Sequence, residues 1–155
     1  MVRLNKTLLA VALLVLLGVG GYWLARLGPE LFPDTRRLAP DPACDLRSGG
    51  CTRTLPDGGV LTLRITPEEL PLMQPLQLVV ELDGREAAGV QVDISGINMD
   101  MGINRTRLEP DGEGRWTGST LLPVCTQQVM RWEAAVWLED GTEILSVPHR
   151  FETRR

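Results

Sequence analysis

Two hydrophobic patterns divide the chain. From Thr7 to Ala25 there is no charged residue, and most side chains are Leu, Val, Ala or Gly. A helix of this length spans about 28 Å, close to the hydrocarbon thickness of a bilayer. Tyr22 and Trp23 stand at the far end of the segment, where interfacial aromatic residues are found. The pattern predicts a single transmembrane helix, with the membrane anchor at residues 1–27.

The charges on either side of this segment bear on its orientation. Arg3 and Lys6 precede it, and positive flanks favour the cytoplasmic side. Arg26, Arg36 and Arg37 follow it and weaken that preference, but a long downstream domain can be translocated regardless of such charges. A cleaved signal peptide is the alternative, although the apolar stretch is long for one and no small-x-small cleavage site follows. We therefore expect an uncleaved anchor and a domain outside the cytoplasm.

The remainder of the chain reads as a spacer followed by strands. Residues 28–59 form a proline-rich spacer that includes a cysteine loop. From residue 60 onward, apolar and polar residues alternate with the period of half-buried strands. The predicted strands, separated by Gly- and Pro-containing turns, are 60–65, 76–82, 90–94, 103–108, 115–122, 130–138 and 145–151. Seven antiparallel strands predict an all-β, immunoglobulin-like sandwich at residues 60–155, with a hairpin across Pro110-Asp111-Gly112.

Charge and motifs exclude several function classes. The region after the anchor holds 13 arginines, no lysine and 20 acidic residues, a formal charge of −7. Such a surface repels nucleic acid, so we expect no nucleic-acid partner. The sequence contains one histidine and no hydrolytic triad, phosphate-binding loop or dinucleotide fingerprint. We therefore predict that the protein is not an enzyme.

The chain has three cysteines, Cys44, Cys51 and Cys125. Cys44 and Cys51 are close in sequence, with Gly49 and Gly50 between them to permit a tight turn. Outside the cytoplasm such a pair is expected to form a disulfide, which leaves Cys125 outside the bond. A reduced pair that binds a metal is the alternative.

A second group of sulfur-bearing residues suggests a copper site. Met99 and Met101 are two residues apart, so on an extended backbone they point to the same side. With Cys125 and Met130 they form a soft donor set suited to Cu(I), and His149 is a weaker candidate ligand. The alternative is that the methionines fill the core, because they are in phase with neighbouring apolar residues and methionine packs well there.

Three motifs resemble a known family. They are Met99-Asp100-Met101-Gly102, the hairpin residues Gly114-Arg115-Trp116, and the strand from Trp132 to Val136. Together with the anchor and spacer, residues 60–150 resemble the FixH and YtkA-like single-pass proteins of bacteria. The resemblance implies an inner-membrane protein with a periplasmic domain that supplies copper to, or assists the assembly of, a haem–copper oxidase. A metal-free immunoglobulin-like module that holds a membrane partner is the competing hypothesis.

Overall fold

A computed structural model gives the structure of the protein and describes residues 6–31, 34–141 and 143–154. The chain divides into two compact units, Met1–Asp34 and Thr35–Arg155. The first unit contains α1 (Lys6–Leu31), and its segment Leu8–Arg26 is long and apolar enough to cross a membrane. The predicted continuous helix is confirmed, and it runs on to Leu31, past the point where the spacer was expected to begin.

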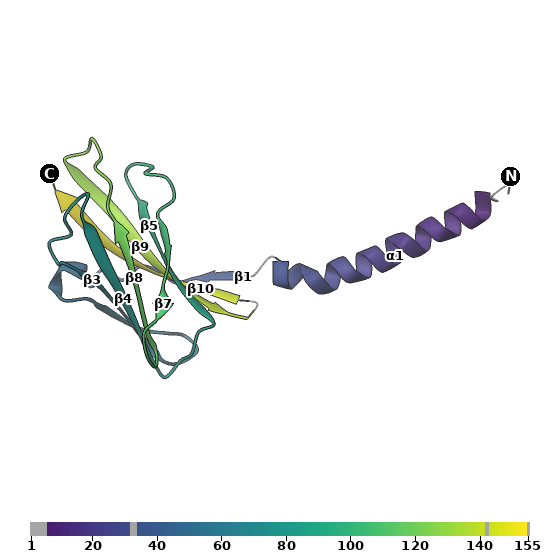
Figure 1. Cartoon of the computed structure of the whole chain (residues 1–155), viewed down its shortest axis with the longest axis horizontal. Coiled ribbons are helices and arrows are strands. Elements are labelled where there is room, and N and C mark those ends of the chain that lie inside the picture. The colour runs from purple at the N-terminus through teal and green to yellow at the C-terminus, as the bar shows by residue number, and fades with distance from the viewer. Residues whose placement is uncertain (1–5, 32–33, 142, 155) are drawn as a thin grey trace. The chain divides into compact units, whose positions relative to one another are not determined.

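The second unit consists of two antiparallel sheets (Figure 1). In its described residues, one sheet has the strand order β1-β10-β9-β5-β6 and the other the order β2-β3-β4-β8-β7. The strands are β1 (Asp34–Arg37), β2 (Cys51–Thr54), β3 (Val60–Thr66), β4 (Pro75–Asp83), β5 (Gly89–Gly96), β6 (Arg105–Arg107), β7 (Glu109–Pro110), β8 (Arg115–Leu121), β9 (Val129–Asp140) and β10 (Glu143–Arg154). A short 3-10 helix, η1 (Leu46–Ser48), precedes β2.

Each predicted strand has a counterpart, so the all-β, two-sheet architecture is confirmed. The described residues form three further short strands, β1, β2 and β7. β1 and β2 come from the segment expected to be spacer, and each lies at the edge of a sheet. The compact unit consequently begins at Thr35 rather than at residue 60.

The hairpin expected across Pro110-Asp111-Gly112 differs from the observed pairing. β6 pairs with β5 in the first sheet, and only the two-residue β7 pairs with β8 in the second. The chain changes sheets at Leu108, whose side chain is buried and whose N–H donates to the Val90 carbonyl. Gly118 makes room for this crossing, since a Cβ there would lie 2.5 Å from Leu108 Cδ2.

The core lies between the two sheets and is built from the alternating apolar residues of β3, β4, β5, β9 and β10. Trp132 on β9 stacks on Phe151 of β10, with ring centroids 6.4 Å apart. Its indole Nε1 donates to Thr153 Oγ1 at 2.9 Å, so the one polar atom of this ring is satisfied within the core.

Glu133 lies on the opposite face of β9 and links β9 to its neighbour β10 and to the edge strand β1. Its carboxylate accepts hydrogen bonds from Arg37 on β1 and from Arg150 on β10, the latter at 3.3 Å. Glu133 is mostly buried, and two guanidinium partners offset the cost of removing its charge from water. This ion-pair triad attaches the short edge strand β1 to the sheet.

Replacing Gly114 with Ala should destabilise the sandwich by about 3 kcal/mol or more. Gly114 has φ +66°, and a Cβ there would lie 2.3 Å from the backbone oxygen of Leu82, which cannot move without disturbing β4. Gly141→Ala is the matched control, because Gly141 has φ +59° but nothing within 4 Å, and it should cost only about 1 kcal/mol. The measurement is urea unfolding of the full chain in detergent micelles, followed by near-ultraviolet circular dichroism. Equal losses in the two variants would contradict the steric argument.

Candidate functional site

Three loops gather at one end of the sandwich, and we call them together the methionine end. They are residues 67–74 between β3 and β4, 97–104 between β5 and β6, and 122–128 between β8 and β9. Pairing of Pro75 with Leu121 and of Gly96 with Trp132 places the loops at one end in each sheet. The Asn104 side chain joins the sheets there by donating to the Leu121 carbonyl at 2.9 Å. Figure 1 shows the loops that follow β5 and precede β9 at the same end.

The 97–104 loop is held against the start of β9 by Asn98. Its side-chain amide donates to the Val129 carbonyl at 3.1 Å, and its Oδ1 accepts from the Arg131 N–H at 2.9 Å. Asp100 Oδ1 accepts from the Gly102 N–H at 2.9 Å and closes a turn. These bonds hold the loop on either side of Met99 and Met101, so its polar residues position the two thioether side chains.

The structure brings Met101 and Met130 together at Gly96. A Cβ at Gly96 would lie 2.3 Å from Met130 Cε and 3.1 Å from Met101 Cγ, so the two side chains meet over a residue that has none. Met130 is buried, whereas Met99 and Met101 are half-buried and pack against the core. Cys125, also buried, lies in the 122–128 loop, where its Sγ is 3.8 Å from the Gln127 carbonyl oxygen. All four predicted ligands therefore lie at the methionine end.

The methionine end also carries the exposed large apolar side chains of the sandwich. Every such residue in the described part of the second unit belongs to this end or borders it, a set we call the apolar rim: Met73, Ile97, Ile103, Leu121 and Val124. Ile103 is 89 % exposed. Large apolar side chains gathered at one end of a domain are a candidate interaction surface. Its residues come from three separate loops and from the last position of β8, so the strand pattern alone did not reveal it.

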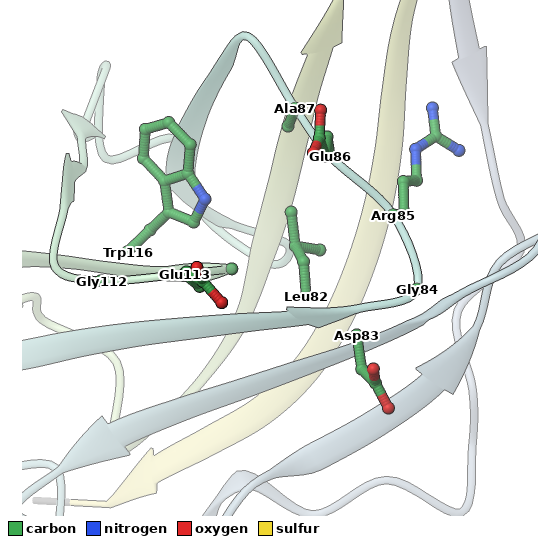
Figure 2. Close-up of a pocket in the computed structure, with 10 residues that line it drawn as sticks. Leu82, Asp83, Gly84, Arg85, Glu86, Ala87, Gly112, Glu113 and Trp116 are labelled. Atoms are coloured by element: carbon green, nitrogen blue, oxygen red, sulfur yellow. The ribbon is translucent and has the colours of Figure 1, made fainter.

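The opposite end is polar and contains a pocket of about 720 Å³ (Figure 2). The turns after β4 and before β8 form it, and Trp116 lies across the pocket from Glu86 and Ala87. The Gly114-Arg115-Trp116 motif therefore lies away from the methionines. Arg85 on the pocket wall pairs with carboxylates of neighbouring turns, at 3.3 and 3.4 Å.

The predicted disulfide is confirmed. Cys44 and Cys51 are bonded, with their Cα atoms 5.5 Å apart, and Cys125 lies outside this bond. Cys51 is buried and Cys44 half-buried. His149 Nδ1 lies 3.5 Å from Cys44 Sγ, and one ligand atom from each of His149, Cys44 and Cys51 lies within 4.8 Å of the others.

His149 does not belong with the methionines, contrary to its candidacy as a further ligand of that site. It is paired with Ala134, whereas Met130 is paired with Thr153, four residues further along β10. Four residues of strand correspond to about 13 Å. The soft donors therefore form two groups, one at the methionine end and one at the disulfide.

No protein-family model matches the chain, and no curated protein matches it.

The surroundings of His149 keep its imidazole neutral. Its side chain is fully buried, and its Nε2 makes no hydrogen bond to any described residue. Burial is the main cause that lowers the pKa of His149 to about 4, and the positive charge of Arg53 lowers it further. The Asp41 carboxylate opposes these effects only in part.

Acid should destabilise the fold through His149. The unfolded chain takes up a proton near pH 6.5 and the folded chain only near pH 4, so stability is lost as the pH falls through that interval and levels off below it. The wild type should lose about 3 kcal/mol relative to His149→Phe over this range. Urea unfolding of both proteins in micelles at a series of pH values gives the difference and cancels the contribution of the carboxylates. Parallel stability curves would contradict the assignment.

Proposed function

We propose that this chain is a membrane-anchored periplasmic accessory protein that binds Cu(I) at the methionine end. We further propose that it assists the assembly of a copper-containing respiratory oxidase. The observation that carries the proposal is the meeting of Met101 and Met130 over Gly96, with Met99 and Cys125 at the same end of the sandwich.

The chemistry of this donor set suits Cu(I). Thioethers are soft, neutral ligands, and the Cys125 thiolate supplies one negative charge to balance a monovalent ion. Zn(II) prefers more thiolate or imidazole ligands than this end offers. Because Met99 and Met101 are half-buried, an ion can approach the site from solvent, and a partner can reach it in turn.

The rest of the molecule supports a location outside the cytoplasm. The apolar helix α1 supplies a suitable anchor. A disulfide such as Cys44–Cys51 persists in an oxidising compartment and is rare in a reducing one. The apolar rim lies at the same end as the proposed copper site, so a partner that docks there would come close to the metal.

Removal of the two half-buried thioethers should weaken copper binding. In Met99→Leu/Met101→Leu the apolar volume is nearly kept while both sulfur atoms are lost, so the fold should survive. We expect Cu(I) affinity to fall at least tenfold in this variant and further in Cys125→Ser. The measurement is competition with a chromophoric Cu(I) chelator, using the full chain in micelles with the disulfide intact.

Met73→Leu is the matched control, because Met73 is an exposed methionine at the same end that lies outside the proposed donor set. Its affinity should equal that of the wild type. Affinities that do not differ among the four proteins would refute the site, and the methionines would then be core and rim residues.

A metal-free interaction module is the second candidate function, and the apolar rim favours it directly. Five exposed apolar residues at one end suffice for a docking surface whether or not an ion is bound. The partner class is the same under both hypotheses, a membrane protein complex such as a haem–copper oxidase or its assembly factors.

Crosslinking from the rim tests the docking surface. A photoreactive amino acid at position 103 should give a discrete adduct with a membrane protein in native membranes, identified by mass spectrometry. The same amino acid at position 86, exposed at the polar end, is the control and should not give that adduct. Identical adducts from both positions would argue against a docking surface at the methionine end. Adduct formation at position 103 that does not depend on copper would favour the metal-free module.

A further inference from the structure

The surroundings of the Cys44–Cys51 disulfide do not resemble those of a purely structural bridge. The loop that carries Cys44 and η1 packs against β10 and β3, so the two sulfurs lie beside the buried His149. Nδ1 of His149 faces Cys44 Sγ at 3.5 Å, and the ring makes no other hydrogen bond among the described residues. A buried imidazole is usually fixed by hydrogen bonds to polar groups, whereas the contact found for this ring among the residues that the structure describes is to sulfur.

The distances match those of a three-ligand metal site. With metal–sulfur and metal–nitrogen bonds of about 2.3 and 2.0 Å, a ligand angle between tetrahedral and trigonal separates sulfur and nitrogen by roughly 3.5 to 3.7 Å. The observed separation of Cys44 Sγ and His149 Nδ1 is 3.5 Å. The same bonds require the two sulfurs to move apart to about 4 Å once the disulfide is broken. Gly49 and Gly50, both with positive φ, precede Cys51 and allow the loop to make this adjustment.

We propose that reduction of the Cys44–Cys51 disulfide creates a Cu(I) site whose ligands are the two thiolates and His149 Nδ1. The redox state of the disulfide thus controls metal binding. In the oxidised protein the two sulfurs are bonded to each other and cannot bind the ion, and in the reduced protein they bind it. This site shares no residue with the methionine end and does not depend on the function proposed for that end.

The reductant is a dithiol. One of its thiolates attacks Cys44 Sγ, the more accessible of the two sulfurs by residue exposure; the disulfide bond breaks and Cys51 leaves as a thiolate. The second thiol of the reductant then displaces the Cys44 thiolate from the mixed disulfide. Two electrons have passed to the cysteine pair, the reductant has become a disulfide, and its two protons have been released. Cu(I) then binds the thiolates with no further change of oxidation state.

The number and type of ligands favour Cu(I) over Zn(II). Thiolates suit both ions, but a structural Zn(II) takes four protein ligands, and a Zn(II) held by two cysteines and one histidine needs water in a fourth position. Among the described residues, no fourth Cys, His or carboxylate joins the cluster within 4.8 Å. Cu(I) is satisfied by the three that are present.

Burial keeps the proposed nitrogen ligand in the neutral form that can bind a metal ion. The His149 pKa is lowered to about 4, so its imidazole remains neutral and its lone pair available in any ordinary buffer. Two charged groups act on this histidine in opposite directions: the positive charge of Arg53 lowers its pKa, and the negative charge of Asp41 raises it.

The test uses the full chain in detergent micelles with Met99→Leu, Met101→Leu and Cys125→Ser, so that the methionine end keeps only Met130 of its four proposed ligands. The protein is reduced with dithiothreitol, desalted under anaerobic conditions and titrated with Cu(I) against a chromophoric chelator. We expect one Cu(I) per chain after reduction and none before it, with two sulfurs and one nitrogen seen by X-ray absorption. Adding His149→Phe should weaken binding at least tenfold while leaving both thiols titratable.

Ser146→Ala is the matched control, because Ser146 is a buried polar residue of the same strand outside the cluster, and its affinity should not change. Near-ultraviolet circular dichroism checks that each variant is folded. The proposal is overturned if the reduced protein binds no Cu(I), if His149→Phe binds as tightly as its parent, or if the site prefers Zn(II) to Cu(I). The oxidised wild type reports on the methionine end alone, so failure there is distinguishable from failure here.

Discussion

The ladder between β9 and β10 is the interaction on which the rest of the structure depends. It runs from the pair of Glu143 and Asp140 to the pair of Arg154 and Val129 without interruption. One face of this ladder supplies Trp132 and Phe151 to the core, and the other face holds the ion-pair triad centred on Glu133. A slip of one residue in this register would exchange the two faces, placing Glu133 in the core and Trp132 in solvent.

The same register separates the two groups of soft ligands. Met130 is the second residue of β9 and therefore lies at the methionine end. His149 lies near the middle of β10, beside the disulfide. Each group then has a different character. The methionines lie beside exposed apolar loops, whereas His149 and Cys51 are buried and only Cys44 of the second group is half-buried. Under the two proposals, one site is open to exchange and the other is controlled by the redox state of its own ligands.

The two ends of the sandwich differ in the polarity of their loops and turns. The turns at the polar end pair their charges with one another, as Arg85 does with Asp57 and Asp140, and a pocket lies among them. In the loops at the methionine end, side-chain amides form hydrogen bonds with backbone groups, and several apolar side chains are exposed. Because exposed apolar surface is unfavourable in water, the contrast supports the proposal that a partner docks at the methionine end.

The sequence by itself determined the elements and several local features. Nineteen uncharged residues predicted the helix, the alternation of apolar residues predicted each long strand, and two cysteines around a pair of glycines predicted the disulfide. These are properties of neighbouring residues, and backbone geometry relates them directly to structure. Tertiary structure decided what depends on pairing across the chain. Leu108 sends its segment into the other sheet because its side chain is buried between the two, and β1 and β2 join sheet edges through contacts with distant strands. His149 lies beside Cys44 rather than Met130 because the register of β10, which no local pattern encodes, places it there.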